Sequence, residues 1–399
     1  MKLSIGIGLL GCGTVGASVA ERLLSDRKAI EKRTGVRYDL RAIAVRNAGK
    51  PRNASLPAEL FTADPFAVLD DPQIDLIVEC IGGVEDATEL VERALDRGRH
   101  VVTANKDLLA TQGPRLQAIA ASRGAMLRYE AAVGGAIPIV RSLGDALAGD
   151  DVRAIGGVFN GTCTSILSAM EQGADYAAAL AEAQRLGYAE ANPSSDVDGH
   201  DAAHKLALLV QLAFGLAVLS PRIARSGISS VSQRDVARAR MMGYRIRLVA
   251  AAVRNARGVQ AEVAPLLVPE HHAFGRTSGA ENVARIVARG AGALELRGAG
   301  AGGPATASAV LGDIVSALRA IGERHDLSMR GQSLALEPAH SVEPLFAALP
   351  HHPQLPRYRV WSDTLLDASE IEPMPRFASP GVTRERKPRK RDASGCPQA

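Results

Sequence analysis

Hydrophobic and polar positions alternate through the first 150 residues in a pattern that predicts strands separated by helices. Apolar runs short enough to be strands lie at Ile5–Leu10, Leu40–Val45, Leu76–Glu79, His100–Thr103 and Ala125–Tyr129. Apolar residues with helical spacing lie between them, at Val15–Leu24, Ala87–Asp96 and Arg115–Ser122. Because this alternation is typical of a parallel sheet with crossover helices, we predict an α/β domain with a doubly wound parallel sheet at residues 1–150.

After residue 150 the two kinds of pattern come in blocks. The strand-like run at Val152–Phe159 is followed by helical spacing, an acidic loop and a long helix that ends near Phe214. Strand-like runs then lead to a glycine-rich stretch and a last helix that ends near Arg324. We therefore predict an α+β domain at residues 151–326, with its last helix returning to the first domain.

The pattern decays in residues 327–399. Prolines interrupt every apolar run, and basic residues gather near the end of the chain. We expect a Pro-rich, basic tail that is disordered, with local structure at most around Val360–Leu366.

Composition is that of an ordinary soluble protein, with 46% hydrophobic and 23% charged residues. No apolar run reaches the ~18 residues that span a bilayer, and the N-terminal sequence MKLSIGIGLLGCG predicts a strand rather than a signal peptide. The four cysteines, Cys12, Cys80, Cys163 and Cys396, lack the spacing of a metal site. We expect a cytoplasmic protein that does not contact a membrane.

The net charge of +4 comes from one short segment. RERKPRKR, at residues 384–391, contributes +5 (six basic residues and one acidic), which leaves the rest of the chain at −1. The charge therefore gives no reason to expect nucleic-acid binding.

Gly11, Gly13 and Gly16 form the pattern G-x-G-x-x-G between the first predicted strand and the first predicted helix. The first glycine would allow a tight turn, the second a close approach of a pyrophosphate, and the third close packing of helix and strand. Thr14 and Val15 begin the helix, whose free N–H groups favour a phosphate. This placement predicts a Rossmann-type dinucleotide-binding domain, although a glycine-rich turn without a ligand is the alternative.

The residue after the second strand favours NADP over NAD. An acidic residue there would bind the ribose of NAD, but the strand runs into Arg46, and Asp39 lies at its other end. A guanidinium group suits a 2′-phosphate, so we expect NADP, with NAD possible as a second choice. The alternative is that Arg46 is a solvated loop cation.

Three further places in the sequence suggest chemistry without deciding it. Asp201 and Lys205 share a helix face beside an acidic loop that holds Glu190; an ordinary i,i+4 surface ion pair is the simpler reading. Lys106 follows the fourth strand, where ligands of such sheets bind, but alone it could be a surface lysine. Glu130 precedes a glycine-rich turn that could coordinate a hard cation or simply cap the next helix.

These segments resemble the homoserine dehydrogenase family. Its motifs appear in order over about residues 5–325, as GCGTVG, TANKDLLA, YEAAVGGAIP, GVFNGTCTSIL, GYAEANPSSDVDGHDAAHK and AGAGGPATASAVLGDI. The resemblance implies reversible NAD(P)-dependent reduction of L-aspartate 4-semialdehyde to L-homoserine, in threonine, methionine and isoleucine biosynthesis. It also implies that residues 151–326 bind the substrate and form a homodimer.

The resemblance implies roles for single residues. Lys205 falls on the proposed proton donor, and Lys106 on a second catalytic lysine. The implied substrate-binding residues are Gly161, Thr162, Tyr188, Glu190 and Asp201. The further cofactor-binding candidates are Thr103, Lys106, Gly187, Gly302 and Gly303. The implied Na⁺ or K⁺ site consists of Glu130, Val133, Gly135 and Ile137.

The chain departs from the family in two places. Thr164 and Ser165 stand where members commonly have Asn and an aromatic residue, which predicts looser packing behind the pocket. Residues 327–399 lack the pattern of the ACT regulatory domain that many bacterial members carry. A non-catalytic NADP-binding homologue, or another amino-acid-linked NAD(P) oxidoreductase, therefore stays an alternative, although both lysines are present.

The mechanism expected from these residues needs a proton and a positive charge at the substrate carbonyl. Lys205 would donate the proton and Lys106 would stabilise developing negative charge. Two neighbouring ammonium groups would lower each other's pKa toward neutrality. Covalent catalysis by Cys163 is not expected, because no histidine lies near it in the sequence.

Overall fold

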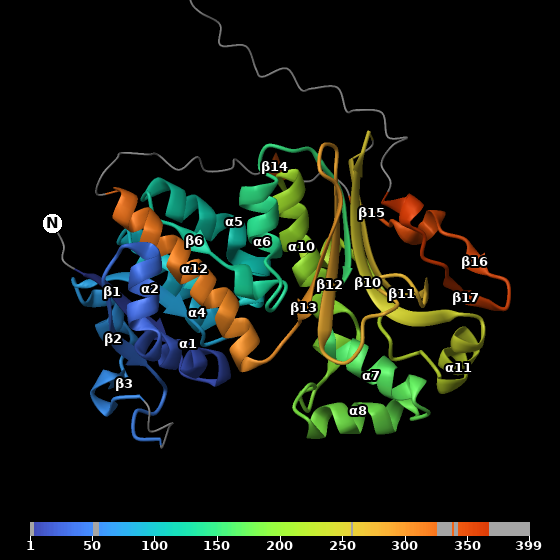
Figure 1. Ribbon diagram of the computed structural model, residues 1–399, viewed down its shortest axis with the longest axis horizontal. Coiled ribbons are helices and arrows are strands. Elements are labelled where there is room, and N and C mark those ends of the chain that lie inside the picture. Colours follow the sequence, from blue (N-terminus) through green and yellow to red (C-terminus); the bar gives the residue numbers. More distant parts are fainter. Residues whose placement is uncertain (1–3, 51–55, 257, 325–336, 339–341, 367–399) are drawn as a thin grey trace, which may run out of the picture.

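The protein was analysed as a computed structural model that describes residues 4–50, 56–256, 258–324, 337–338 and 342–366. It contains two α/β units side by side, joined by a helix that crosses from the second back to the first (Figure 1).

The first unit is built on a six-stranded parallel sheet with the order β3-β2-β1-β4-β5-β6. Its strands are β1 (Ile5–Leu10), β2 (Tyr38–Ala44), β3 (Phe61–Thr62), β4 (Ile74–Glu79), β5 (His100–Thr103) and β6 (Leu127–Arg128). Its helices are α1 (Thr14–Ser25), α2 (Arg27–Thr34), α3 (Pro65–Asp70), α4 (Glu85–Asp96) and α5 (Lys106–Ser122). Short helical turns lie at Ala58–Leu60 and Glu130–Ala132. The predicted doubly wound parallel sheet is confirmed.

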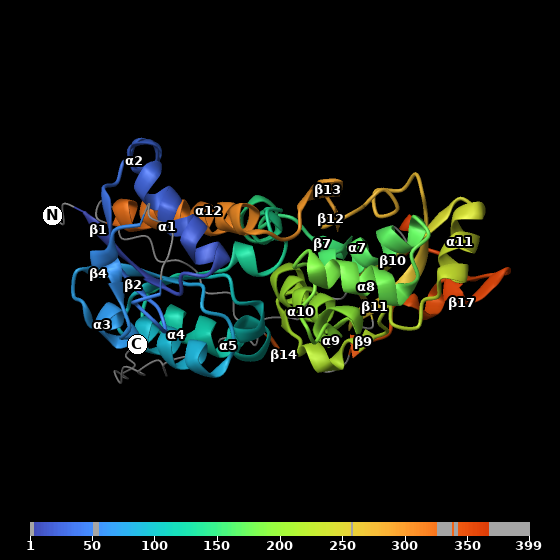
Figure 2. The same ribbon diagram turned by 90° about the horizontal axis from the view of Figure 1, so that it is seen from below.

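Helices cover both faces of this sheet (Figure 2). On one face α1 packs with the long helix α12 (Gly303–Arg324) in a core that includes Val19, Leu23, Ile314 and Leu318. On the other face α3, α4 and α5 form a separate core with the sheet. Residues Gly303–Glu323 are long and apolar enough to cross a membrane by length and composition, but half of that stretch is buried. The apolar side of α12 is therefore explained by its packing in the core of the first unit.

The second unit is built on a mixed sheet with the order β13-β12-β7-β10-β11-β15 and with β9 beside β11. Its strands are β7 (Val152–Val158), β9 (Ala224–Arg225), β10 (Tyr244–Asn255), β11 (Gly258–Pro269), β12 (Glu281–Ala288), β13 (Gly292–Ala299) and β15 (Val342–Glu343). The helices are α6 (Ile139–Arg141), α7 (Gly161–Glu171), α8 (Tyr176–Arg185), α9 (Ser194–Val197), α10 (His200–Phe214) and α11 (Gln233–Met241). Shorter elements are a π-turn at Ser142–Ala146, a 3₁₀ turn at Ser220–Arg222, and the paired strands β8 (Leu216–Ala217) and β14 (Glu337–Pro338). The predicted mixed α+β character of this unit is confirmed.

The expectation of disorder from residue 327 onward is wrong for residues 344–359, and the local structure expected around Val360–Leu366 is present. Residues 344–366 form a segment that holds β16 (His351–His352), β17 (Leu355–Arg359) and two 3₁₀ turns, Phe346–Ala348 and Asp363–Leu365. Phe346, Trp361 and Leu366 are buried against the face of the second sheet that α7 and α10 do not cover. The segment lies at the end of the molecule opposite the first unit (Figure 1). Residues 367–399 lie outside the described part of the chain.

Candidate functional site

The glycine-rich loop has the backbone geometry that its sequence predicts. Gly11 has φ = 91°, a value that side chains disfavour, and a Cβ on Gly16 would lie 2.2 Å from the Gly11 carbonyl oxygen. A Cβ on Gly13 would meet nothing within 4 Å. Gly13 is also the N-cap of α1 and provides no side-chain cap, so the first N–H groups of the helix remain available to a phosphate.

A second helix begins beside this loop. A Cβ on Gly303, the first residue of α12, would lie 2.9 Å from the side chain of Thr14 at the start of α1. Gly302 has φ = 111° and open space around it. Two helix N-termini therefore meet where the cofactor is expected.

Arg46 lies at the mouth of a cleft beyond the carboxyl end of β2. The cleft is lined by Arg46, Val45, Ile81 and Gly82, together with acidic residues of α4 such as Asp86. The Arg46 side chain is exposed and able to reach a ligand in the cleft. This is the end of the sheet at which dinucleotides bind.

Thr103 was expected to bind the cofactor, but its side chain makes contacts within the protein. Its side chain is fully buried, donates a hydrogen bond to Glu79 and accepts one from the Asn105 N–H. Burial raises the pKa of Glu79, against hydrogen bonds from Thr103 and from the Ile81 N–H. A contact of Thr103 with a cofactor would therefore have to come from its backbone.

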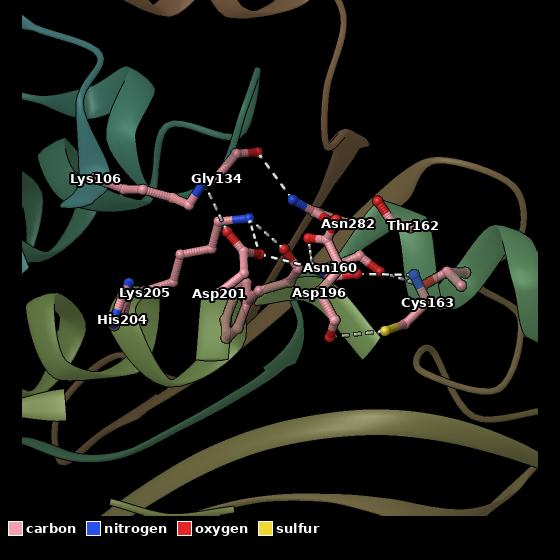
Figure 3. Close-up of polar contacts among 12 residues, drawn as sticks. Lys106, Gly134, Asn160, Thr162, Cys163, Asp196, Asp201, His204, Lys205 and Asn282 are labelled. Carbon is pink, nitrogen blue, oxygen red and sulfur yellow. Dashed lines mark hydrogen bonds and ion pairs between the residues drawn. The ribbon is translucent and has the colours of Figure 1, made fainter. Parts of the chain in front are cut away.

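Lys106, Asp201 and Lys205 meet where α5 faces α10 (Figure 3). Lys106 is the first residue of α5, after Asn105 caps the helix by accepting a hydrogen bond from Leu108 N–H. Lys106 Nζ lies 3.2 Å from Asp201 Oδ1, and Lys205 Nζ lies 2.8 Å from Asp201 Oδ2. Lys205 Nζ also donates to the carbonyl of Phe159 at 2.7 Å. The i,i+4 pair predicted from the sequence is thus a buried bridge between two lysines.

The charges of this bridge support one another. Burial would raise the pKa of the Asp201 carboxyl, but the ammonium groups of Lys205 and Lys106 outweigh it and hold that pKa well below its ordinary value. Burial would lower the pKa of Lys106, but Asp201 and Asp107 outweigh it and raise that pKa. The expectation that the lysines lower each other's pKa is therefore wrong for Lys106, because a carboxylate lies between the two ammonium groups.

Asn160 links this bridge to the acidic loop, a role that the sequence analysis missed. Its Nδ2 donates to Asp201 Oδ2 at 2.8 Å and to Asp196 Oδ1 at 2.7 Å, while its Oδ1 caps α7 at Cys163 N–H. Burial, followed by the nearby Asp201 charge, raises the pKa of Asp196. Two sequence signals pointed to Asn160: its position directly before a helix and its place in the motif GVFNGTCTSIL.

The expected substrate residues surround the start of α7. The Thr162 hydroxyl donates to the Tyr188 carbonyl at 2.6 Å, which ties the loop after α8 to this helix. Gly161 lies against Ala280, where a Cβ would approach within 3.2 Å. Glu190 is exposed, and its carboxylate has no partner among the residues that the structure describes. Gly187, before Tyr188, is also exposed.

Buried Cys163 is unsuited to nucleophilic attack. Its side chain is fully buried and its Sγ donates to the Asp196 carbonyl at 3.2 Å. Burial, reinforced by the nearby Asp196 and Asp201 charges, raises the thiol pKa well above its ordinary value. This agrees with the expectation against covalent catalysis.

The Glu130 carboxylate fits the helix-cap alternative better than a cation site. It accepts hydrogen bonds from Val140 N–H at 2.8 Å and from Arg141 N–H at 2.9 Å, and it pairs with the Arg141 guanidinium at 3.1 Å. Within the described residues, no cluster of three or more His, Cys, Asp or Glu side chains could hold a metal ion.

The turn after Glu130 still has a feature that fits a small cation. Asn282 is fully buried beside this turn, with Nδ2 only 3.5 Å from the Gly134 carbonyl oxygen. Its Oδ1 is buried without a hydrogen-bond partner. Because buried acceptors are normally satisfied, this oxygen and the turn's carbonyl groups are the ligands that fit, rather than the Glu130 carboxylate.

Comparisons with known proteins agree over most of the chain. Residues 11–130 match the family model described as homoserine dehydrogenase, NAD binding domain, and residues 138–315 match the model described as homoserine dehydrogenase. The homoserine dehydrogenase of Corynebacterium glutamicum is 44% identical over 322 residues, covering 79% of this chain and 72% of that protein. The Neisseria gonorrhoeae enzyme is 38% identical, covering 84% of this chain and 77% of that protein.

Solved structures show the same similarity. A homoserine dehydrogenase from Thiobacillus denitrificans has a TM-score of 0.79 at 39% identity, covering 88% of this chain and 84% of its own. A hyperthermophilic archaeal homoserine dehydrogenase in complex with NADPH has a TM-score of 0.67 at 28% identity, covering 79% of this chain and 97% of its own.

Proposed function

Because the chain belongs to the homoserine dehydrogenase family, we propose that it interconverts L-aspartate 4-semialdehyde and L-homoserine with Lys205 as the proton donor. The observation that carries this assignment is the bridge of Lys106, Asp201 and Lys205, which begins at the first residue of α5, after strand β5 of the parallel sheet. The enzyme is an oxidoreductase that acts on a CH–OH group and uses a nicotinamide cofactor.

The contacts of the Lys205 ammonium group orient it to donate a proton to the substrate oxygen. An ammonium group has three N–H donors, and two of those on Lys205 are used by the Phe159 carbonyl and Asp201. The third is free to donate to the substrate oxygen, which carries negative charge when the aldehyde is reduced. The bound cofactor supplies the hydride. Lys106, charged through its contact with Asp201, stabilises the same negative charge.

Asp201 acts through the lysines. Its two oxygens are occupied by Lys106, Lys205 and Asn160, so it is a positioning residue. The substrate ammonium group then falls to the exposed Glu190, beside the loop that Thr162 holds through Tyr188. Gly161 completes the substrate pocket at the start of α7.

NADP is the proposed cofactor, bound at Gly11, Gly13, Thr14, Val15 and Gly16. The uncapped N-terminus of α1 would hold the pyrophosphate, and Arg46 would bind the 2′-phosphate in its cleft. Thr103, Lys106, Gly187, Gly302 and Gly303 would line the remainder of the cofactor site.

Three further proposals concern the whole protein. Na⁺ or K⁺ would be held by carbonyl groups of the turn at Val133, Gly135 and Ile137 together with Asn282 Oδ1, and it would fix the turn against β12. The enzyme would be a cytoplasmic homodimer formed through residues 151–326.

The test is steady-state oxidation of L-homoserine by the Lys205→Ala variant. Lys205, the proposed general acid of the reduction, would accept the hydroxyl proton in the oxidation, and loss of such a group removes roughly 10²-fold or more from kcat, so we expect a loss of that order. Lys28→Ala, which changes an exposed lysine of α2, is the control and should retain wild-type turnover. Near-wild-type kcat in Lys205→Ala would refute the role of Lys205, and an inactive wild type would refute the assigned reaction.

A further inference from the structure

Helices α5 and α10 are joined by a hydrogen bond from Gln211 to Gln117 at 2.6 Å and, at the start of α5, by two contacts made by consecutive residues of that helix. Lys106 contacts Asp201, and Asp107 Oδ1 lies 3.0 Å from His204 Nδ1. Asp107 follows Lys106 and His204 precedes Lys205 in the sequence. The Asp107–His204 contact therefore joins the residues next to the two proposed catalytic lysines, and it crosses from the nucleotide-binding unit to the substrate-binding unit.

The two contacts differ in their access to solvent. The Asp201 side chain is 4% exposed, whereas those of Asp107 and His204 are 42% and 24% exposed. The inner contact is reachable by solvent only from its lysine, whose side chain is 34% exposed, whereas both partners of the outer contact are partly exposed. The outer contact is nevertheless well formed: the hydrogen bond with His204 is the first cause of a lowered pKa at Asp107, and Lys106 lowers it further. Among the described residues, neither Asp107 nor His204 is an ion-pair partner of Lys106 Nζ or Lys205 Nζ, so neither has a role in the chemistry proposed above.

We propose that the Asp107–His204 contact is a latch between the two units that positions the Lys106 ammonium group against Asp201 and Lys205. This inference rests on the proposed function, because it assigns a consequence for turnover. Without the latch, the Lys106–Asp201 contact is the remaining ion pair between the start of α5 and α10 among the described residues, and the hydrogen bond between Gln211 and Gln117 lies further along both helices. His204 and Asp107 are positioning residues.

Charged groups from both helices face the latch. From α5, Lys106 and Asp107 face His204, and from α10 itself Asp201 and His200 lie nearby. A glutamine in place of His204 could donate a hydrogen bond to Asp107 without carrying a positive charge.

The test is a double-mutant cycle of His204→Ala and Asp107→Ala, measured as kcat for homoserine oxidation and as urea unfolding. A displacement of the reacting groups by about 1 Å can cost up to 10²-fold, so we expect each single variant to lose roughly 10-fold in kcat. The KM for the cofactor should stay within twofold, because the glycine-rich loop is unchanged. The double variant should lose no more than either single variant, since both remove the same contact.

Two further variants separate the latch from a general structural effect. His204→Gln should recover most of kcat, because the glutamine amide can donate a hydrogen bond to Asp107 in place of the imidazole. Asp96→Ala, which removes the exposed Arg123–Asp96 pair within the nucleotide-binding unit, is the matched control and should not alter kcat.

The outcomes distinguish the latch from the proposed reaction. Multiplicative losses in the double variant, or single variants with normal kcat, would overturn the latch while leaving the reaction intact. A wild type that does not oxidise homoserine, with coupling still present in the unfolding cycle, would overturn the reaction and not the contact.

Discussion

Asp201 shows how burial changes the meaning of a common sequence pattern. An exposed i,i+4 pair of carboxylate and ammonium contributes about 0–1 kcal/mol, and such a pair was the simpler reading of Asp201 and Lys205. The carboxylate is instead 4% exposed and accepts from Lys106, Lys205 and Asn160. Removing one partner from a buried pair typically costs about 3–5 kcal/mol, because the other charges lose their compensation.

We predict that Asp201→Asn lowers the free energy of unfolding by about 3 kcal/mol at pH 7. Because the folded-state pKa of Asp201 is lowered, its contribution is present above the pKa of the unfolded chain and is lost as pH falls toward the folded value. The difference from wild type should therefore be constant above pH ~5 and shrink below pH ~4. Denaturant titrations between pH 3 and 8 measure it, and a difference that grows toward low pH would contradict the stated sign.

Arg46 is the residue on which cofactor choice is predicted to depend. A hydrogen bond to a charged group contributes about 1.5–3 kcal/mol, so Arg46→Ala should raise the KM for NADPH by roughly 10-fold or more and that for NADH little. Steady-state kinetics with both cofactors measure this. Equal losses for the two would show that Arg46 does not contact a 2′-phosphate.

The sequence motifs predicted which segments carry the site, but not the contacts that their residues make. The three glycines and Lys106 stand at strand ends or helix starts that the sequence pattern reveals, and Lys205 shares a predicted helix face with Asp201. Asn160, Asp107 and His204 lie inside the motifs and Asn282 outside them, and all four have partners between 36 and 148 positions away, which no local pattern indicates.

The start of helix α5 differs from the start that the hydrophobic pattern predicted. Helix α5 begins at Lys106, nine residues before the helical spacing predicted a start at Arg115. Gly113 and Pro114 interrupt the apolar pattern there, yet the helix continues through them because Leu108, Leu109 and Leu116 are buried against the rest of the fold. Tertiary packing outweighed local propensity, and Lys106, the proposed partner of Lys205, gained a fixed position at a helix N-terminus.

Two glycines of the loop before α1 should respond differently to the same substitution. In Gly16→Ala the new Cβ would lie 2.2 Å from the Gly11 carbonyl oxygen, so we expect a lower melting temperature. Gly13 has φ = −81° and open space, so Gly13→Ala should fold normally but bind the cofactor more weakly. Thermal unfolding and cofactor titration of both variants test this, and equal stability of the two would contradict it.

At the scale of the whole molecule, the C-terminal segment completes the second unit. Prolines and the near absence of regular elements predicted no structure for this segment, residues 344–366, before residue 360. The segment is instead held in place by its packing against the sheet. Trp361 Nε1 donates to Asp363, and Asp363 also contacts His272 at 2.9 Å. The burial of Trp361 and Phe346 on the sheet becomes visible only when the sheet itself is known.

Trp361 should therefore be among the residues most important to stability. It is 2% exposed, and loss of such a side chain typically costs about 3–5 kcal/mol, which is the loss expected for Trp361→Ala. Met241→Ala, which changes a side chain that is 88% exposed, is the control and should have little effect. Denaturant unfolding followed by circular dichroism measures both. Equal stability of the two variants would mean that the segment does not pack on the sheet in solution.

The return of α12 to the first unit has a consequence for synthesis on the ribosome. The core beneath α1 contains Ile314 and Leu318, so it cannot close until the whole substrate-binding unit has been translated. At 5–20 residues per second, the interval from residue 150 to the end of α12 takes roughly 10 to 30 s. During that time an apolar strip of α1 lies open to chaperones or to other nascent chains, and the unit that is made first is completed last.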